Sequence, residues 1–285
     1  SKSDILWQQN STGYAHMSLM NGSTRTSTTY LGGGSGWVVV GNGDFNGDGK
    51  SDILWRQSST GNVYMWLMNG TTITSSVYVG GGVDWTVAAT GDFNGDGKSD
   101  ILWQQISAGY VHMWLMNGST MTSSSYLGGG AGWSFAGTRD FNGDGKSDVL
   151  WRQTSTGYVH MWLMNGATVA SSAYIGGGTD WVVAGTGDLN GDGKNDILWQ
   201  QTSTGYVHLW LMNGATILSS SYVGGGGVGW NVVATGDYNG DGKNDILWQQ
   251  TSTGSVYMWL MNSATFTSSS YIGGGTDWSV RSKPQ

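Results

Sequence analysis

A repeat of about 48 residues runs through the chain and restricts the folds that it can adopt. The phrase D-[FLY]-N-G-D-G-K-[SN]-D recurs with this period, opening at Asp44, Asp92, Asp140, Asp188 and Asp237. Three series of tryptophans keep the same period and account for all 17 tryptophans. They are the Trp37 series (Trp37, Trp85, Trp133, Trp181, Trp230, Trp278), the Trp55 series (Trp7, Trp55, Trp103, Trp151, Trp199, Trp248) and the Trp66 series (Trp66, Trp114, Trp162, Trp210, Trp259), with Ser18 at the remaining position of the third. The chain therefore holds six copies of one unit.

Each copy contains four short segments rich in β-forming residues and separated by turn residues. In the third copy we expect strands over Trp85–Thr90, Asp100–Gln105, Tyr110–Met116 and Met121–Leu127. Four strands per repeat at this period are typical of a β-propeller blade, and the scarcity of strong helix formers disfavours helices. The sequence predicts an all-β, six-bladed β-propeller of four-stranded blades, in which residues 1–285 form a single domain.

The two ends of the chain together supply one complete repeat. Residues 1–36 begin where the Asp-rich phrase would end, and residues 278–285 open with another member of the Trp37 series. We expect the C-terminal segment to give the innermost strand of a blade whose other three strands are N-terminal. This exchange closes a ring, as a propeller requires and a capped solenoid does not. A seventh blade or an oligomer stays open if the chain is a fragment.

Composition excludes several classes of protein. The formal net charge is −7 without a basic patch, which speaks against a nucleic-acid partner. Cysteine is absent, so disulfides and zinc–thiolate sites are excluded. No apolar run approaches the roughly 18 residues that span a bilayer, and the chain does not start with a signal peptide. We expect an extracellular monomer, secreted by a signal peptide outside this chain, with no membrane insertion.

The Asp-rich phrase has the composition of a calcium-binding loop. Its positions 1, 3, 5 and 9 carry Asp or Asn, and the backbone carbonyl of the lysine at position 7 adds an oxygen. Such hard ligands on a tight glycine-containing loop suit Ca²⁺, whereas a metal-free Asp/Asn/Gly turn is the alternative. Position 12 is a tryptophan and not the glutamate of an EF-hand. The first copy keeps only Asp4, so we expect about five structural ions.

The expected calcium ligands are the same five positions in each complete phrase. They are Asp44, Asn46, Asp48, Lys50 and Asp52; Asp92, Asn94, Asp96, Lys98 and Asp100; Asp140, Asn142, Asp144, Lys146 and Asp148; Asp188, Asn190, Asp192, Lys194 and Asp196; and Asp237, Asn239, Asp241, Lys243 and Asp245.

The motif D-x-N-x-D-G-x-x-D-[IV]-L-W resembles the FG-GAP/VCBS repeats of integrin α-subunit propellers and of bacterial secreted proteins. The resemblance covers essentially the whole chain, and it implies calcium in the loop between the first and second strands of a blade. A similar loop occurs in propeller lectins of the Psathyrella velutina type. That likeness implies binding of terminal N-acetylglucosamine-type sugars, whereas integrins use the fold to bind proteins.

The third strand of each copy carries a recurring set of aromatic residues. Alternation places Tyr110, His112 and Trp114 on one side of this strand, with Val111 and Met113 on the other. Rings of this kind stack on sugars and hydrogen-bond to them, although packing against neighbouring blades explains them as well. The candidate ligand-binding residues are Tyr14, His16, Tyr64, Trp66, Tyr110, His112, Trp114, Tyr158, His160, Trp162, Tyr206, His208, Trp210, Tyr257 and Trp259.

Three functional hypotheses follow from these features. A calcium-stabilised, multivalent carbohydrate-binding protein with glycan or glycoprotein partners is favoured, because near-identical repeats give near-identical sites. A protein-interaction or adhesion propeller, or a scaffold, is the alternative. Catalysis is disfavoured, because there is no glutamate and most aspartates belong to the Asp-rich phrase. Outside that phrase we expect Asp84, Asp180 and Asp277 to cap turns.

Overall fold

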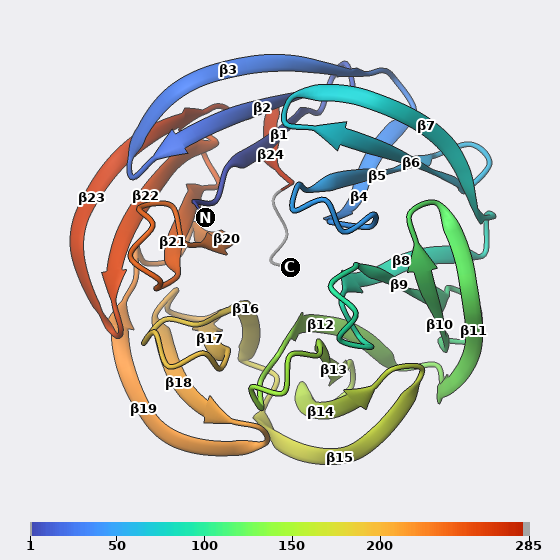
Figure 1. The fold of residues 1–285 in the computed structure, drawn as a ribbon. Helices are drawn as coiled ribbons and strands as arrows, with labels where there is room; N and C mark the ends of the chain where they lie inside the picture. Colours follow the sequence, from blue (N-terminus) through green and yellow to red (C-terminus); the bar gives the residue numbers. More distant parts are fainter. Residues whose placement is uncertain (1, 282–285) are drawn as a thin grey trace. The chain divides into compact units, whose positions relative to one another are not determined.

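The structure, a computed structural model, describes residues 2–281, and these contain strands and turns but no helix. The strands form six antiparallel sheets of four strands each, so the predicted six-bladed β-propeller is confirmed (Figure 1). No helix of the described residues is long and apolar enough to cross a membrane. Each blade uses its strands in sequence order, except where the two ends of the chain meet.

The blades are numbered I to VI, and their strands have closely similar lengths. Blade I contains β24 (Trp278–Val280), β1 (Ile5–Gln9), β2 (Tyr14–Asn21) and β3 (Thr24–Gly33). Blade II contains β4 (Trp37–Gly43), β5 (Asp52–Gln57), β6 (Asn62–Asn69) and β7 (Thr72–Gly81). Blade III contains β8 (Trp85–Gly91), β9 (Asp100–Gln105), β10 (Tyr110–Asn117) and β11 (Thr120–Gly129).

The remaining three blades follow the same plan. Blade IV contains β12 (Trp133–Arg139), β13 (Asp148–Gln153), β14 (Tyr158–Asn165) and β15 (Thr168–Gly177). Blade V contains β16 (Trp181–Gly187), β17 (Asp196–Gln201), β18 (Val207–Asn213) and β19 (Thr216–Gly224). Blade VI contains β20 (Trp230–Gly236), β21 (Asp245–Gln250), β22 (Ser255–Asn262) and β23 (Thr265–Gly274).

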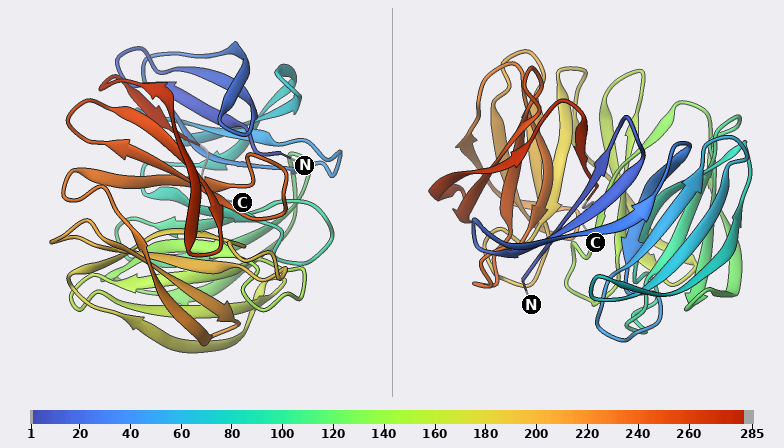
Figure 2. Two further views of the ribbon diagram at one scale, coloured as in Figure 1. Left: turned by 90° about the vertical axis from the view of Figure 1, so that its left-hand side faces the viewer. Right: turned by 90° about the horizontal axis from the view of Figure 1, so that it is seen from above.

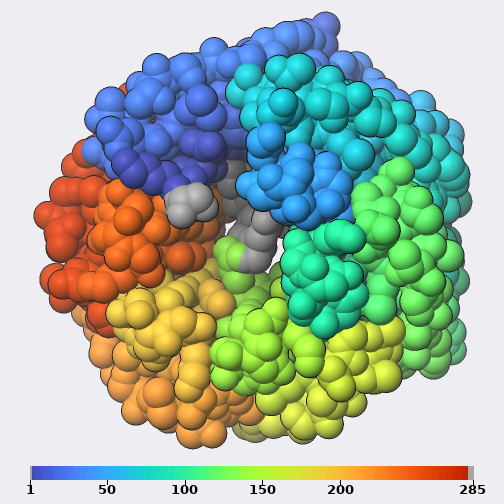
Figure 3. All heavy atoms as spheres, viewed as in Figure 1, coloured from blue at the N-terminus to red at the C-terminus, as the bar shows by residue number. Residues whose placement is uncertain are grey.

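The chain divides into two compact units. Among the described residues, the first unit comprises 2–32, 141–143 and 175–281 and includes blades V, VI and I. The second unit comprises 33–140 and 144–174 and includes blades II and III and most of blade IV. Within the second unit, the colours of the three blades follow one another in sequence order on the surface (Figure 3).

The two ends of the chain share blade I. The C-terminal strand β24 pairs antiparallel with the N-terminal strand β1, with Trp7 opposite Val280 and Gln9 opposite Trp278. The backbone N–H of Arg281 continues this ladder by donating to the carbonyl of Leu6 at 2.7 Å. The expected exchange of strands is therefore confirmed for the described part, while residues 282–285 of the predicted segment lie outside the described residues.

The sharp turn between the third and fourth strands explains the recurring Asn-Gly dipeptide. Gly70 and Gly118 have φ values of 60° and 61°, a left-handed conformation that glycine adopts without steric cost. Blade VI has Ser263 at this place, with φ of 55°. It is the one residue other than glycine with positive φ in the described part of the chain. The fold thus holds Ser263 in a conformation that disfavours L-residues.

The core of each unit lies between consecutive blades. Successive side chains along a strand point to opposite faces of the sheet, so each blade packs against a neighbour on both faces. Leu102, Val111 and Met113 of blade III pack with Val149 and Trp151 of blade IV. The opposite side of blade III presents Ile101, Trp103 and Met116 to blade II. Burying apolar residues on both sides explains why the second strands read Ile-Leu-Trp or Val-Leu-Trp without polar interruption.

The observed strands differ from the predicted ones at their ends. Strand β11 extends over both Thr120 and Gly129, beyond the predicted Met121–Leu127, because glycines continue the ladder with β10. The register of β8 against β9 shifts between Val87 and Ala89, and β10 against β11 shifts twice. Such bulges increase the strand twist, which is visible in the edge views of Figure 2.

Candidate functional site

The Asp-rich loop joins the first and second strands of a blade and is organised by its first aspartate. The Asp44 carboxylate accepts hydrogen bonds from the backbone N–H groups of Gly47 at 2.7 Å, Asp48 at 3.1 Å and Gly49 at 2.7 Å. The side chains of Asn46 and Asp48 each accept a hydrogen bond from the N–H two residues onward, both at 2.9 Å. The loop therefore has a defined shape, with its carboxylates at the surface.

The aspartate at position 9 has a different role, because it is buried. One oxygen of Asp100 accepts the N–H of Phe93 at 3.0 Å, and the other accepts the N–H of Met116 at 2.8 Å. This carboxylate thus ties the loop to the third strand. Burial raises the pKa of Asp100 to about 7, the two backbone hydrogen bonds lower it, and the charges of Asp96 and Asp92 add to the rise.

The same arrangement recurs in the other blades. Burial raises the pKa of Asp52 and of Asp245 to about 6, and that of Asp196 to about 7. In blade I the remnant Asp4 still accepts the N–H of Met20 at 2.9 Å. The tie between position 9 and the third strand therefore persists where the rest of the phrase is missing.

The donor set of the loop fits a hard cation. Asp44, Asn46 and Asp48 present oxygens on one turn, and the charges of Asp48 and Asp44 both contribute to the raised pKa of Asp52. A divalent cation would relieve this repulsion. Within residues 2–281, however, no three His, Asp or Glu side chains meet the distance requirements of a metal site.

Lysine at position 7 joins consecutive blades. The Lys98 side chain lies against Gly47 of the preceding loop and donates to the Asn117 side chain of its own blade at 2.8 Å. The backbone N–H groups of Ser99 and Gly118 donate to the carbonyls of Asp44 and Phe45 at 2.6 and 2.7 Å. The Asp-rich loops and the Asn-Gly turns thus lie at the same end of the blades.

An aromatic face lies toward the other end of each blade. We define it as the side that carries one member of the Trp37 series, one of the Trp55 series and the His or Tyr opposite the latter. His112 lies 5.2 Å from Trp85 and 5.4 Å from Tyr126 between ring centroids. In blade II, Tyr64 lies 5.4 Å from Trp37 and 5.5 Å from Tyr78. A chain of edge-on rings therefore crosses the blade from its first strand to its fourth.

Two cavities open on these faces in the second unit. The blade II cavity measures about 350 Å³, and its lining consists of Gly33, Trp37, Trp55, Gln57, Tyr64, Trp66 and Ser76. The second cavity, about 280 Å³, lies between blades III and IV. Its lining consists of Gly109, Val111, Gly129, Trp133, Trp151, His160, Trp162 and Ser172. Neither lining includes Asp, Lys or Arg among the described residues.

Each of these cavities has a buried hydrogen-bond donor in its wall. Trp55 and Trp151 are 1% and 2% exposed, and their indole N–H groups have no hydrogen-bond partner among the described residues. The same holds for Trp7, Trp103, Trp199 and Trp248, so the feature recurs in every blade. A buried donor without an acceptor is costly, and natural proteins rarely keep one without a reason.

The structure divides the predicted ligand-binding residues into two groups. Tyr64 and Trp66 line the first cavity, and His160 and Trp162 line the second. Tyr158 lines neither cavity; it is 45% exposed and contacts the Tyr174 ring at 5.2 Å. Tyr14, Tyr110 and Tyr206 are exposed in the same way against the tyrosine of their fourth strand.

The Trp66 series also packs against the preceding blade. A Cβ added to Gly80 would lie 2.7 Å from the Trp114 ring, and one added to Gly176 would lie 2.6 Å from Trp210. In blade I, where Ser18 replaces the tryptophan, the Arg25 guanidinium takes this position and donates to the carbonyl of Ile272 beside Gly273. Blade I therefore has a charged guanidinium where the other blades have a tryptophan ring.

Sequence reasoning missed part of the cavity walls. The walls also include Trp37, Trp55 and Ser76 in the first cavity and Trp133, Trp151 and Ser172 in the second, none of which was among the predicted ligand-binding residues. The glycines before each Trp37-series residue are the signal in the sequence. Gly61, in the turn between the second and third strands of blade II, packs against these glycines. A Cβ at Gly61 would lie 2.1 Å from the carbonyl oxygen of Gly82.

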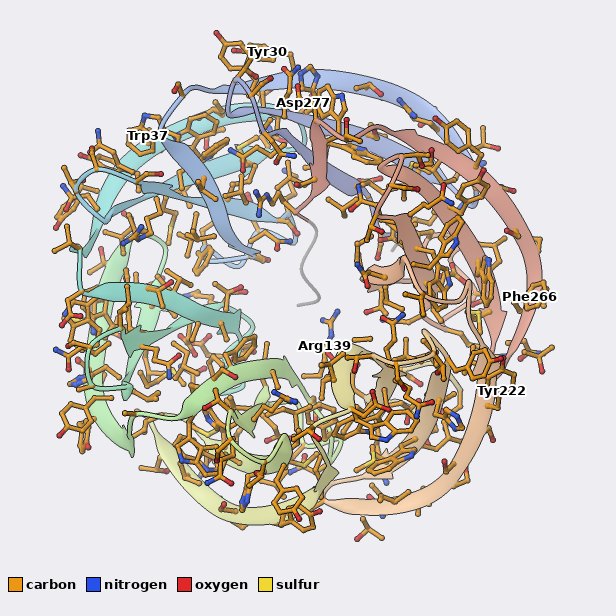
Figure 4. The ribbon with its side chains drawn as sticks, turned by 180° about the vertical axis from the view of Figure 1, so that it is seen from behind. Tyr30, Trp37, Arg139, Tyr222, Phe266 and Asp277 are labelled. Carbon is orange, nitrogen blue, oxygen red and sulfur yellow. The ribbon has the colours of Figure 1, made fainter. Side chains whose placement is uncertain are left out.

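The predicted turn caps are confirmed. The Asp84 carboxylate accepts hydrogen bonds from the side chain and backbone N–H of Ser107 and from Gln105. Asp180 accepts from Ser203, Thr202 and Gln201, and these bonds lower its pKa to about 2. Asp277, labelled in Figure 4, binds Ser11 and Gln9 in the same manner. These three aspartates fix the turns beside the aromatic faces.

Comparison with solved structures finds the same fold in unrelated settings. A chain of a nidogen/laminin complex is 14% identical with a TM-score of 0.63, over 93% of this chain and 92% of that chain. A chain of the Photorhabdus luminescens Tc holotoxin pore is 14% identical with a TM-score of 0.53, over 97% of this chain and 14% of that one. At such identities the likeness concerns the fold alone. No curated protein matches the sequence.

The sequence also matches a family model. The model describes an FG-GAP-like repeat, and it matches residues 44–103, 140–199 and 188–248. These ranges together cover more than half of the chain, and each begins at the first aspartate of an Asp-rich phrase. With six blades of the same repeat, the chain belongs to the FG-GAP-like repeat family.

Proposed function

We propose that this FG-GAP propeller is a multivalent carbohydrate-binding protein whose ligands enter the cavities on the aromatic faces. The observation that carries the proposal is the unpartnered indole N–H in the wall of each described cavity, at Trp55 and Trp151. A sugar oxygen that reaches this depth accepts the hydrogen bond, and the cost of the buried donor is removed.

The other walls suit the remaining surfaces of a sugar. The rings of Trp37 and Trp66 offer apolar surfaces for the C–H faces of a pyranose, while Gln57, Ser76 and the Tyr64 hydroxyl offer polar contacts for its hydroxyl groups. The absence of Asp, Lys and Arg from both described linings favours a neutral ligand. Terminal N-acetylglucosamine is the first sugar to test.

The repeated sites together can give a high overall affinity, although each small site alone binds weakly. Each of the six blades carries a member of the Trp55 series with the same unpartnered donor. Several weak sites on one rigid protein bind a surface of many sugars far more tightly than any one site binds a free sugar. The proposed partners are therefore glycans or glycoproteins that display repeated terminal sugars.

Calcium belongs to the same proposal in a structural role. Asp44, Asn46, Asp48, the Lys50 carbonyl and Asp52, with their equivalents, would hold about five ions. A bound ion would neutralise the clustered carboxylates and order the loop that Asp52 ties to the third strand. The ions would lie at the opposite ends of the blades from the aromatic faces, so they would support the sugar sites through the fold. We assign no catalytic role to any residue.

Glycan-array binding tests this function. Protein in calcium buffer is expected to bind arrays of terminal N-acetylglucosamine or a related neutral sugar, and to bind more strongly as the sugar density rises. Trp55→Phe combined with Trp151→Phe keeps two rings but removes two donors, and it should lower the binding. Met121→Ala alters an exposed side chain on a fourth strand and serves as the control.

Two results would contradict the proposal. Folded, calcium-loaded protein that binds no sugar on the array would exclude it and leave a protein-interaction or scaffold role. If the number of sites for the free sugar, measured by calorimetry, is unchanged in the double Phe variant, the indole donors of Trp55 and Trp151 are not used. In that case the sugar site would lie elsewhere on the protein.

A further inference from the structure

The residue before each member of the Trp37 series alternates along the chain between aspartate and glycine. Blades I, III and V have Asp277, Asp84 and Asp180 at this position, and blades II, IV and VI have Gly36, Gly132 and Gly229. We call these two sets the aspartate blades and the glycine blades. Both described cavities, of about 350 and 280 Å³, lie on the aromatic faces of glycine blades. This position therefore separates the six faces into two sets of three.

The two residues belong to different turns. In each set the backbone N–H of the tryptophan donates to the carbonyl three residues before it, at 3.1 Å in blades II and III. Gly36 has a φ of 84°, which a type II turn requires at its third residue and which glycine adopts without strain. Asp84 does not have a positive φ. The linker before the first strand therefore has a different backbone conformation in the two sets.

A glutamine lies directly opposite each tryptophan of the Trp37 series. Trp85, for example, is paired with Gln105 on the neighbouring strand, and side chains opposite one another share one side of the sheet. The glutamine therefore belongs to the aromatic face. In the aspartate blades its Nε2 donates to the aspartate carboxylate. These bonds run from Gln105 to Asp84 at 2.8 Å, from Gln201 to Asp180 at 2.8 Å and from Gln9 to Asp277, labelled in Figure 4, at 2.9 Å.

The carboxylate is a strong acceptor for this glutamine. Hydrogen bonds from Ser107 and Gln105 lower the pKa of Asp84, so its carboxylate is ionised at neutral pH. A hydrogen bond to an ionised acceptor is roughly twice as strong as one between neutral groups. A sugar oxygen is neutral, so it competes poorly with the aspartate for Nε2. In the aspartate blades the glutamine is therefore withheld from a ligand.

In the glycine blades the same glutamine has a free amide nitrogen. Oε1 of Gln57 accepts a hydrogen bond from Thr60 at 2.8 Å, which fixes the direction in which the amide group faces. Among residues 2–281, Nε2 of Gln57 has no acceptor, and Gln57 belongs to the lining of the blade II cavity. Gln153 and Gln250 are held by threonines in the same way, at 2.7 and 2.8 Å. The glycine blades thus offer a second hydrogen-bond donor to a ligand.

On the basis of the proposed function, we propose that the residue before the Trp37 series determines the affinity of each face for a sugar, with strong sites in blades II, IV and VI and weak sites in blades I, III and V. In the strong sites two groups donate to the sugar, the indole N–H of the Trp55 series and Nε2 of the glutamine. In the weak sites the indole N–H acts alone, because it is unpartnered in all six blades whereas the glutamine is bound to aspartate. One further neutral hydrogen bond raises the affinity about three- to tenfold.

A titration with N-acetylglucosamine, followed by NMR in calcium buffer, tests this inference; the array supplies the probe if another neutral sugar binds better. The indole N–H resonances of the Trp55 series, assigned with single Trp→Phe variants, report on each face separately. We expect the resonances of the glycine blades to saturate at a sugar concentration about three- to tenfold lower than those of the aspartate blades. The first group is Trp55, Trp151 and Trp248, and the second is Trp7, Trp103 and Trp199.

Matched glutamine variants separate the role of this side chain in the two sets. The triple variant Gln57→Met, Gln153→Met and Gln250→Met removes the second donor and should weaken the strong sites about three- to tenfold, to the affinity of the others. The control triple variant Gln9→Met, Gln105→Met and Gln201→Met should leave the strong sites unchanged.

Conversion of the aspartate blades gives the opposite test. The triple variant Asp84→Gly, Asp180→Gly and Asp277→Gly releases the three glutamines and permits the type II turn, so the faces of blades I, III and V should gain affinity about three- to tenfold. Adding the control glutamine changes to this variant should cancel the gain. If the converted protein does not fold, which its melting temperature reveals, the glutamine variants still decide the question.

The possible failures are distinguishable. Six faces that saturate at the same sugar concentration, or strong sites that are unaffected by the loss of their glutamines, would overturn the inference and leave the sugar-binding function intact. If no resonance of the Trp55 series responds to sugar in the parent protein, the proposed sugar sites and the inference are both wrong.

Discussion

The two ends of a single blade differ in how much variation the repeats tolerate. At one end, the Asp-rich loop repeats almost without change in the five blades that contain it, and its hydrogen bonds recur with it, as those of Asp44 and Asp92 show. At the other end, the aromatic face changes from His to Tyr, and the Trp66 series gives way to Ser18 in blade I. The end with the Asp-rich loop has the same structural role wherever the loop occurs. The end with the aromatic face can differ between blades in the ligand that it recognises.

The outer strands extend this contrast to the surface. Tyr30 and Tyr222, labelled in Figure 4, lie on the outer strands of blades I and V and are 54% and 55% exposed. Their rings join the edge-on chains that begin at the Trp37 series. The aromatic end is thus accessible from solvent, while the carboxylate at position 9 of the loop is fully buried. Changes in the loop should affect stability, and changes in the face should affect binding.

Removal of calcium should have the largest effect on stability. If calcium is present at about 100 times its dissociation constant, each occupied loop contributes about 2.7 kcal/mol to the free energy of unfolding. Five loops should therefore give a large fall in melting temperature when EDTA is added, measured by calorimetry. Magnesium at the same concentration is the control. A melting temperature unaffected by EDTA would show that the loops hold no structural calcium.

The next largest effect is expected from the buried aspartate. Asp100→Ala leaves the N–H groups of Phe93 and Met116 without acceptors and should reduce the free energy of unfolding by about 2–5 kcal/mol. Asp100→Asn keeps one acceptor and should cost less. Urea unfolding in EDTA measures both, with the exposed Asp96→Ala as the matched control. If Asp96→Ala is the more damaging change in EDTA, the assigned roles of the two positions are wrong.

A pH dependence of stability should follow from the same carboxylates. In EDTA the pKa of Asp100 is raised to about 7 in the folded state, well above its ordinary value. The folded protein then binds the proton more tightly than the unfolded chain, so stability is greatest in acid and falls between about pH 4 and 7. We expect a higher melting temperature at pH 5 than at pH 8 in EDTA. In calcium the order should reverse, because the ion competes with protons.

The smallest predicted effect concerns the turn of blade VI. Ser263→Gly relieves the positive φ of 55° at the place where other blades have glycine, and it should stabilise the protein by about 0.5–1 kcal/mol. The converse change, Gly118→Ser in blade III, should destabilise it by a similar amount. Urea unfolding of both variants provides the measurement. If Ser263→Gly lowers the free energy of unfolding, or Gly118→Ser raises it, other contacts of the turn outweigh the effect of its backbone conformation.

Much of the fold was predictable because the repeat carries its own turn signals. The phrase spacing, the Asn-Gly turns and the matching chain ends predicted six blades and the pairing of β24 with β1. The Asp84 turn cap was also predictable, because a lone Asp before a Trp in a glycine-rich turn has few other uses. The phrase and the turn residues recur at a fixed spacing, so they can be recognised without knowing which strands pack together.

The walls of the candidate sites were only partly predictable. Alternation along one strand identified Tyr64 and Trp66, but the contribution of Trp37 and Ser76 depends on how four strands pair. The unpartnered N–H of Trp55 depends on which atoms surround it in three dimensions. The Arg25 guanidinium lies beside Gly273, where other blades place a tryptophan ring, but Arg25 belongs to a different strand from that tryptophan and leaves no periodic signal.

A crystal structure of the protein soaked with the best neutral sugar from the array tests the central claim most directly. We predict sugar density in the cavities of blades II and IV, with a sugar oxygen within hydrogen-bond distance of Nε1 of Trp55 or Trp151. Density for the sugar away from the aromatic faces, or cavities that stay free of sugar at saturating concentration, would contradict the claim.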